Sequence, residues 1–397
     1  MLELSYSLTP IKQQHIRPIF MKRRLASFAV FSLVCAIATV TRSQEAATTA
    51  IELESGRELY DSACASCHAA DGRGRSQAQL GFETPVPDFT DCDFAAREPD
   101  ADWGSIIHEG GPVRGFDRMM PAFGDALSDR EIELILMQVR SFCTNPDWPR
   151  GELNMPRALF TEKAYPEDEG VITTTIVTEG NDSISHQFLW EQRFGTRNQM
   201  EISLPVSRAE IDTGIQNATT TRSGAGDLGI GVKHVLRHSH ENGTILSVGG
   251  ELILATGNDA LGFGKGTTVF EPYIAFGKLL PKDRFVQVQA FAEFPHDNGL
   301  NDEIAARVAV GQSFAANRGY GRVWTPMFEV MAARDRVDGA TTHWDVVPQM
   351  QVTLNTRQHI MAAAGLRLPV NDKSGRETEF VFYLLWDWFD GGVREGW

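Results

Sequence analysis

The stretch NQMEISLPVSR, residues 198–208, alternates apolar and polar side chains with a period of two. In an extended strand, this alternation places the two kinds of side chain on opposite faces. The apolar face would carry Met200, Ile202, Leu204 and Val206, and the polar face Gln199, Glu201 and Ser203. The stretch therefore predicts a β-strand that lies between an apolar and a polar environment.

The same pattern recurs along the rest of the chain and predicts about twelve antiparallel strands. Most are about ten residues long, which suits tilted strands that cross a bilayer. The expected spans are 171–179, 185–194, 199–207, 227–237, 244–254, 268–278, 285–294, 303–314, 322–332, 344–354, 358–369 and 378–389.

The connections between these segments alternate in length. Those after even-numbered segments are short, whereas 208–226 and 255–267 are long and polar. Outer-membrane barrels have short periplasmic turns and longer outer loops. Residues 171–397 resemble the porin-like and transporter-like barrels of Gram-negative outer membranes, although Trp397 is separated from the last strand. A soluble β-sandwich is the alternative, but the strand count and the Gln- and Glu-rich faces favour a barrel in contact with outer-membrane lipid.

The N-terminal region has the layout of an export signal. A basic start at Lys22, Arg23 and Arg24 precedes an apolar run over 25–40 and then small and polar residues. We expect a signal peptide within residues 1–43, with 1–20 as an upstream extension. A retained membrane anchor is the alternative, but the apolar run is short for a span of about 20 residues.

A second motif, CASCHAADGRG at residues 64–74, has the C-x-x-C-H spacing of covalent c-type haem attachment. Cys64 and Cys67 would bind the porphyrin, and His68 would be an axial ligand of the haem iron. A zinc or thiol-redox site is the alternative. Zinc sites usually carry a second ligand pair at similar spacing, which is absent nearby, and a redox CxxC does not require the histidine.

Residues 108–143 extend this interpretation. They contain an MPAFG sequence, a helix start of the LSDxEI kind and a helix that ends near VRSF, and so resemble class I c-type cytochromes. The resemblance implies one covalently attached haem c, with Met120 as the sixth ligand of the iron. Met119 and His108 are rival ligands. Ser128 and Glu131 form a capping box, and one face of the following helix is apolar: Ile132, Ile135, Leu136, Val139 and Phe142.

These patterns predict a two-domain protein. An all-α cytochrome c domain, residues 52–148, precedes a linker, 149–170, and an antiparallel transmembrane β-barrel of about twelve strands, 171–397. Cys92 and Cys143 remain as a pair, and an oxidising compartment permits a disulfide between them, with two free thiols as the alternative.

The net charge is −15 with a pI near 5.2, which argues against nucleic acid as a partner. We expect an electron carrier in the outer membrane, with its cytochrome domain and an unidentified redox partner in the periplasm. It would have no substrate chemistry of its own. The alternative is a porin or transporter whose cytochrome domain is a redox-sensing plug or gate.

Overall fold

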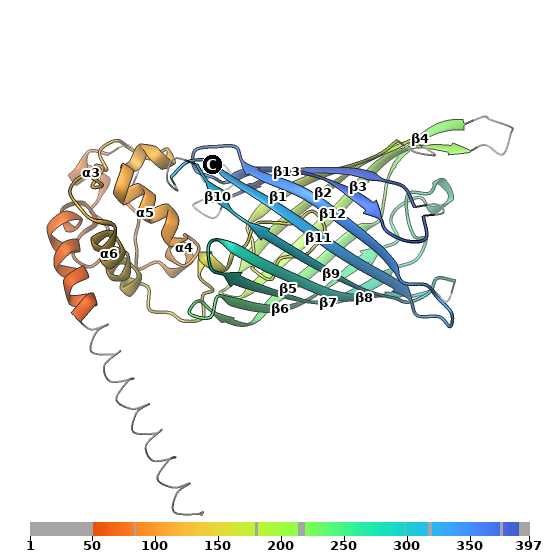
Figure 1. Ribbon diagram of the computed structural model, residues 1–397, viewed down its shortest axis with the longest axis horizontal. Helices are drawn as coiled ribbons and strands as arrows, with labels where there is room; N and C mark the ends of the chain where they lie inside the picture. The colour runs from red at the N-terminus through yellow and green to blue at the C-terminus, as the bar shows by residue number, and fades with distance from the viewer. Residues whose placement is uncertain are drawn as a thin grey trace, which may run out of the picture. The chain divides into compact units, whose positions relative to one another are not determined.

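The computed structural model describes residues 51–82, 85–178, 182–212, 219–297, 299–316, 320–373 and 376–388. Twelve strands form one closed antiparallel barrel, in which β9 pairs with β11 to complete the circle (Figure 1). Their bounds are β1 Glu169–Val177, β2 Ser183–Phe194, β3 Asn198–Asp212, β5 Leu228–Ser239, β6 Thr244–Leu254, β7 Val269–Leu280, β8 Arg284–Pro295, β9 Glu303–Gln312, β11 Val323–Asp335, β12 His343–Thr353, β13 Ile360–Pro369 and β14 Glu379–Asp387. The predicted twelve-stranded barrel is confirmed.

Two further strands lie outside this circle. Strand β4 (Thr219–Ala225) pairs with the end of β3, and the two-residue β10 (Phe314–Ala315) pairs with β11. Strand β4 belongs to the long connection between β3 and β5, so the β3–β4 hairpin extends beyond Leu228, where β5 begins.

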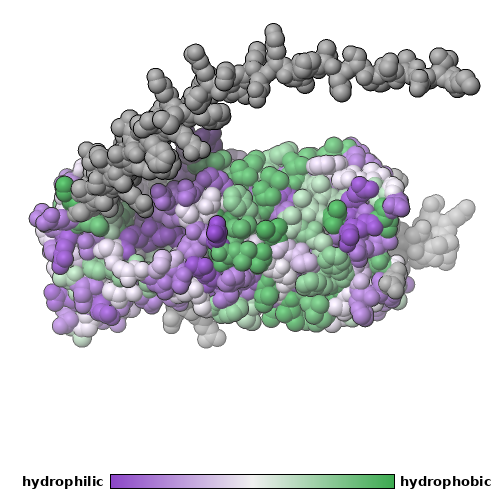
Figure 2. Space-filling model, turned by 90° about the horizontal axis from the view of Figure 1, so that it is seen from below, coloured by the Kyte–Doolittle hydropathy of each residue, from purple (hydrophilic) through white to green (hydrophobic). Residues whose placement is uncertain are grey.

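The barrel has its apolar side chains on the outside and its polar side chains within. On β3, Met200 and Ile202 are exposed, whereas Gln199 and Glu201, which alternate with them, are buried. The face drawn in Figure 2 carries a broad apolar band across the strands. This distribution is the reverse of a soluble β-sandwich and is the one that a lipid-facing barrel requires.

The connections at the two ends of the barrel differ, as the sequence predicts. The short-turn end carries residues 195–197, 240–243, 281–283 and 354–359, and the long-loop end carries 219–227 and 255–268. Both Glu169, which begins β1, and Asp387, which ends β14 and pairs with it, lie at the short-turn end. The chain therefore enters and leaves the barrel at the same end.

The N-terminal region is small and helical. Residues 51–63 are helical, and the elements that follow are α2 (Ala65–His68), α3 (Gln77–Leu80), α4 (Cys92–Ala95), α5 (Asp100–Glu109), the 3-10 turn η1 (Gly111–Arg114) and α6 (Asp129–Phe142). Among the described residues, no helix is both long and apolar enough to cross a membrane.

Helix α6 is formed as its sequence predicts. The Ser128 side chain accepts a hydrogen bond from the Glu131 backbone N–H, and the Glu131 carboxylate accepts one from Ser128 N at 2.8 Å. Ile135 is fully buried, and the rest of the predicted apolar face packs into the same cluster: Ile132, Leu136, Val139 and Phe142. Capping thus sets the start of the helix, and burial of one face fixes it against Tyr60 and Trp103.

A disulfide bond joins Cys92, at the start of α4, to Cys143, directly after α6. Their Cα atoms are 5.2 Å apart, within the usual range. Nearby, Arg140 of α6 donates to the carbonyl oxygens of Ala95 and Glu98. Together these links hold α4 and the chain that follows it against α6.

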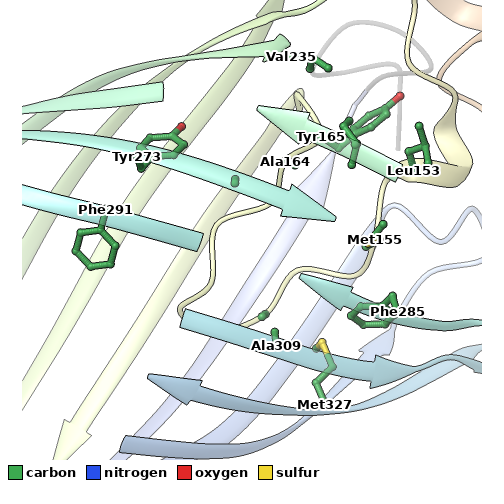
Figure 3. Close-up of a cluster of buried hydrophobic side chains, with 13 residues drawn as sticks. Leu153, Met155, Ala164, Tyr165, Val235, Tyr273, Phe285, Phe291, Ala309 and Met327 are labelled. Carbon is green, nitrogen blue, oxygen red and sulfur yellow. The ribbon is translucent and has the colours of Figure 1, made fainter. Parts of the chain in front are cut away.

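Residues 151–168, which the sequence suggests are part of a linker, lie inside the barrel and are called the lumenal loop here. Figure 3 shows Leu153, Met155, Ala164 and Tyr165 of this loop against side chains of the barrel wall. The wall contributes Val235, Ile245, Tyr273, Ala275, Phe285, Phe291, Ala309 and Met327 to this cluster. The loop is thus packed into the lumen as part of a hydrophobic core.

Polar groups of the wall satisfy the backbone of the lumenal loop. Glu329 accepts the N–H groups of Phe160 and Thr161, at 3.1 and 2.7 Å. Further bonds join the N–H of Leu159 to Gln349, that of Glu162 to Gln289 and that of Glu167 to Gln199, and the carbonyl of Pro156 to Gln287. An irregular segment can remain inside a barrel because its backbone groups have such partners.

Charged side chains of the loop are paired with the wall as well. Arg157 lies 2.9 Å from Glu191 of β2, and Lys233 of β5 lies 2.7 Å from Glu162. Carboxylate oxygens of Glu162, Glu191 and Glu201 lie within 4.8 Å of one another. The Lys233 ammonium supplies positive charge to this group of carboxylates.

The loop reaches Glu329, halfway along β11, and leaves space towards the long-loop end. A cavity of about 570 Å³ there has a mixed polar and apolar lining, which includes Ser203, Asp227, Glu251, Ile253 and Phe263. The predicted signal peptide, residues 1–43, and Trp397 both lie outside the described residues.

Candidate haem site

Four predicted site residues line one cavity in the helical region. It has a volume of about 850 Å³, and its walls include Cys64, Cys67, His68 and Met120. The rest of its lining is largely aromatic and aliphatic, with Phe89, Phe94, Trp103, Ile107, Leu136 and Val139. Ligand sites of this size are commonly apolar with a few placed polar groups.

The local fold of the first motif explains how its residues meet. The helix over 51–63 continues through a turn at Cys64 into α2, where the N–H of His68 bonds to the carbonyl of Cys64 at 2.9 Å. The two cysteines are therefore one helical turn apart and lie on the same cavity wall. Neither is in a disulfide, and burial, followed by the charge of Cys67, raises the pKa of the Cys64 thiol to about 11.

His68 is held in an apolar setting. Its ring stacks on Phe89, with the ring centres 5.0 Å apart, and its Nδ1 is buried without a hydrogen-bond partner. Burial lowers the pKa of His68 to about 4, so the imidazole is neutral at pH 7. A neutral ring keeps a lone pair available for a metal ion.

The loop that carries Met120 is fixed by its own backbone. The N–H of Gly111 bonds to the carbonyl of Met120 at 3.1 Å, and Gly110, with φ of 84°, ends α5. A Cβ on Gly111 would lie 2.3 Å from the Asp117 carbonyl oxygen, so this close approach requires glycine. Met120 packs against the hydrophobic core of the helical region, whereas Met119 is 58% exposed.

The rival ligand His108 is directed elsewhere. It lies in the last turn of α5, where Nδ1 is 2.9 Å from Glu109 and the ring stacks on Tyr320 with ring centres 4.7 Å apart. His108 is not among the residues that line the cavity. Of the three candidates for a sixth ligand, Met120 is therefore the best placed, because Met119, which also lines the cavity, is the more exposed.

The sequence did not predict that the barrel would contribute to this site. Arg357, in the turn between β12 and β13, is one of the residues that line the cavity. Tyr320, in another short-turn connection, accepts a hydrogen bond from Arg114 at its carbonyl oxygen, 2.8 Å away. The short surface turn at residues 355–357 carries no sequence signal for a role at a site more than 200 residues earlier in the chain.

The residues present fit a c-type haem. Two thiols, a neutral buried imidazole with an unpartnered nitrogen and a thioether face one apolar cavity of sufficient size. Thioether and imidazole donors are common axial ligands of haem iron, and apolar walls limit access of water to it.

The family model for subunit III of cbb3-type cytochrome c oxidase matches residues 52–136, which are the helical region and no part of the barrel. This match implies that the region binds haem. No curated protein sequence is significantly similar to the chain.

Solved structures resemble the barrel at low sequence identity. An outer membrane channel of the COG4313 group from Pseudomonas putida F1 is 14% identical with a TM-score of 0.42, and covers 58% of this chain and 99% of its own. The KdgM porin (10%, TM-score 0.36) and the NanC porin (8%, TM-score 0.39) each cover 55% of this chain and 98% of their own. Because these TM-scores lie below 0.5, the assignment of a membrane barrel rests on the closed sheet and its apolar exterior.

Proposed function

We propose that this protein is a one-electron carrier in the outer membrane, with a single covalently bound c-type haem in a periplasmic domain. The observation that supports this most is the convergence of Cys64, Cys67, His68 and Met120 on one apolar cavity. When bound, the haem would supply an Fe(III)/Fe(II) couple. The protein residues hold it, exclude water and set its ligand field.

Each cysteine would form a thioether without a change of oxidation state. Each thiol would add across a vinyl double bond of the porphyrin, so that one carbon–sulfur bond would form and the thiol proton would pass to the neighbouring vinyl carbon. His68 and Met120 would supply an imidazole and a thioether ligand to the iron, and a thioether sulfur raises the reduction potential relative to two imidazoles. With both positions filled by protein, the site favours electron transfer over oxygen binding.

The lumenal loop fills the half of the barrel nearest the short-turn end. This supports a barrel that acts as a membrane anchor over one that acts as an open pore. The lumenal loop, continuous with the haem domain, is bonded to the wall through Glu329, Gln349 and Gln289. A barrel closed in this way holds the domain at the short-turn end, which outer-membrane barrels direct to the periplasm. Carboxylates at the cavity, among them Asp88, Asp91 and Asp117, would attract a basic redox partner.

Cell fractionation with haem staining tests this function. We expect covalent haem in the outer-membrane fraction, resistant to denaturing extraction and absent after Cys64→Ala with Cys67→Ala. Haem found only in the soluble periplasm would overturn the anchored carrier, and an unstained full-length chain would overturn the haem assignment.

The position of the lumenal loop also supports a second candidate, a transporter gated by the redox state of the haem domain. The loop joins that domain directly to the lumen, so a change in the domain could alter how the loop is seated. Liposome swelling by oxidised and reduced protein separates the two functions. Flux that is the same in both states would rule out gating.

A further inference from the structure

The cavity that would hold the haem has an unusual distribution of charge. Its lining includes the carboxylates of Asp88, Asp91, Glu98 and Asp117. Among the described lining residues, Arg357 alone carries a guanidinium or ammonium group. A haem brings two further carboxylates, its propionates. Among the described charged residues that line the cavity, Arg357 is then the one cation beside several carboxylates, and it comes from the barrel.

Arg357 is held beside the loop that leads to Met120. The guanidinium carbon of Arg357 lies 4.7 Å from the centre of the Phe116 ring, which is a cation–π contact. A side chain at Gly115 would meet the Cγ and Nε atoms of Arg357 at 3.8 Å. The arginine therefore lies along residues 115 and 116, a few positions before the proposed ligand.

The turn that carries Arg357 is itself fixed. Asn355 accepts the N–H of Ile360 at its side chain, 2.9 Å away, and the N–H of Gln358 at its carbonyl. The Gln358 side chain bonds across to the carbonyl of Gly321 at 3.0 Å. The neighbouring Tyr320 is in turn bonded to Arg114 of the helical region. The turn after β12 and the connection before β11 thus support each other, and both help to hold the Arg357 guanidinium at the cavity.

We propose that Arg357 is a haem-positioning residue that the barrel contributes to the cytochrome site, where it binds a haem propionate. This inference rests on the proposed function. A guanidinium forms paired hydrogen bonds with a carboxylate, which suits a propionate better than the compact ammonium of lysine does. Positive charge beside the haem also disfavours the more positive Fe(III) state, so Arg357 raises the reduction potential.

The test is the midpoint potential of the full-length protein, measured by spectroelectrochemistry in detergent. We expect Arg357→Gln to lower the midpoint potential. At a fixed applied potential, the Fe(III)/Fe(II) ratio should rise three- to tenfold, and tenfold corresponds to about 59 mV. Arg357→Lys keeps the charge, and its potential should lie closer to the native value. Arg284→Gln is the matched control, since Arg284 begins β8 beside another short turn, donates to the carbonyl of Pro281 and does not line the cavity.

The visible spectrum shows whether each variant retains its haem and its methionine ligand. Arg357→Gln with a native midpoint potential, or Arg357→Lys with as large a shift as Arg357→Gln, would overturn the proposal. Failure of the proposed function looks different, because the native chain itself would then lack a covalent, redox-active haem.

Discussion

Lys233, on the inner wall of β5, donates a hydrogen bond to Glu162 of the lumenal loop across 2.7 Å, and its side chain is completely buried. The contact joins residues 71 positions apart and lies beside Glu191 and Glu201. The pair thus links a charge of the barrel wall to a charge of the segment that fills the barrel.

Replacement of Lys233 by Glu should open the barrel. The new carboxylate would face three others, and breaking a buried ion pair costs about 3–5 kcal/mol, which would raise the open population more than about a hundredfold. Planar-bilayer conductance measures this: we expect almost none for the native protein and clear channels for the variant. Lys278→Glu, at the barrel end where Lys278 bonds to Asn242, is the control and should stay closed. A folded Lys233→Glu barrel with native conductance would show that this pair does not seat the loop.

Met120→Ala should remove the proposed sixth ligand of the haem iron. The expected results are loss of the weak absorption band of a methionine-to-iron bond and a lower reduction potential, because a thioether favours Fe(II). Met119→Ala is the matched control, since its side chain is largely exposed. An unchanged spectrum in Met120→Ala, or loss of the band in Met119→Ala, would contradict the assignment.

Glu152→Gln should destabilise the protein in a pH-dependent way. Burial alone would raise the pKa of Glu152, but hydrogen bonds and charge from Arg150, together with the charge of Arg140, lower it from 4.5 to about 2. A carboxyl group with a lowered pKa contributes stability above pH 4.5 and loses it as the pH falls towards 2. At about 1.4 kcal/mol per pKa unit, the contribution at pH 7 is about 3 kcal/mol.

Denaturant unfolding, followed through the haem absorption at pH 7 and pH 3, measures this difference. Glu133→Gln serves as the control, because the pair of Glu133 with Arg130 lies at the surface and contributes less than about 1 kcal/mol. Equal losses for Glu152→Gln at both pH values would show that ionisation of this carboxyl group does not stabilise the fold.

Loss of the Cys92–Cys143 disulfide should lower the stability of the haem domain. The bond closes a loop of 51 residues, for which the chain-entropy relation gives about 4 kcal/mol and typical measurements 2–4 kcal/mol. We expect the double Ser variant to unfold at lower denaturant concentration. Reductant should bring the native protein to the same midpoint and leave the variant unchanged. A reductant effect on both would point to other thiols.

The barrel was predictable because its signal is local. Each strand has one face towards lipid and one towards the lumen, so apolar and polar residues alternate with a period of two in stretches such as 198–208. The predicted spans agree with the observed strands within a few residues. The spacing of Cys64, Cys67 and His68 is likewise local, and helix α6 carries its own cap and apolar face.

The lumenal loop could not be predicted in the same way. Residues 151–168 have no periodicity, and their partners Glu329 and Gln349 lie about 170 to 190 residues further along the chain. One signal was present: carboxylates such as Glu191 and Glu201 on inward faces need buried partners. These inward-facing carboxylates indicate that groups which pair with them must occupy the lumen, but they do not indicate which segment of the chain supplies those groups. Arg357 had no signal, because its role depends on how the turns meet the helical region.

The two ends of the lumenal loop lie next to each other. The Tyr165 hydroxyl donates to the carbonyl of Pro149 at 3.2 Å, and the Asn154 side chain donates to Glu167 at 3.2 Å. The loop thus enters and leaves through one mouth and is not threaded through the cylinder. It can be seated after the strands have closed, or drawn out again, without breaking a single strand pair. Closure of the strands into a barrel therefore does not require the loop to be in place first.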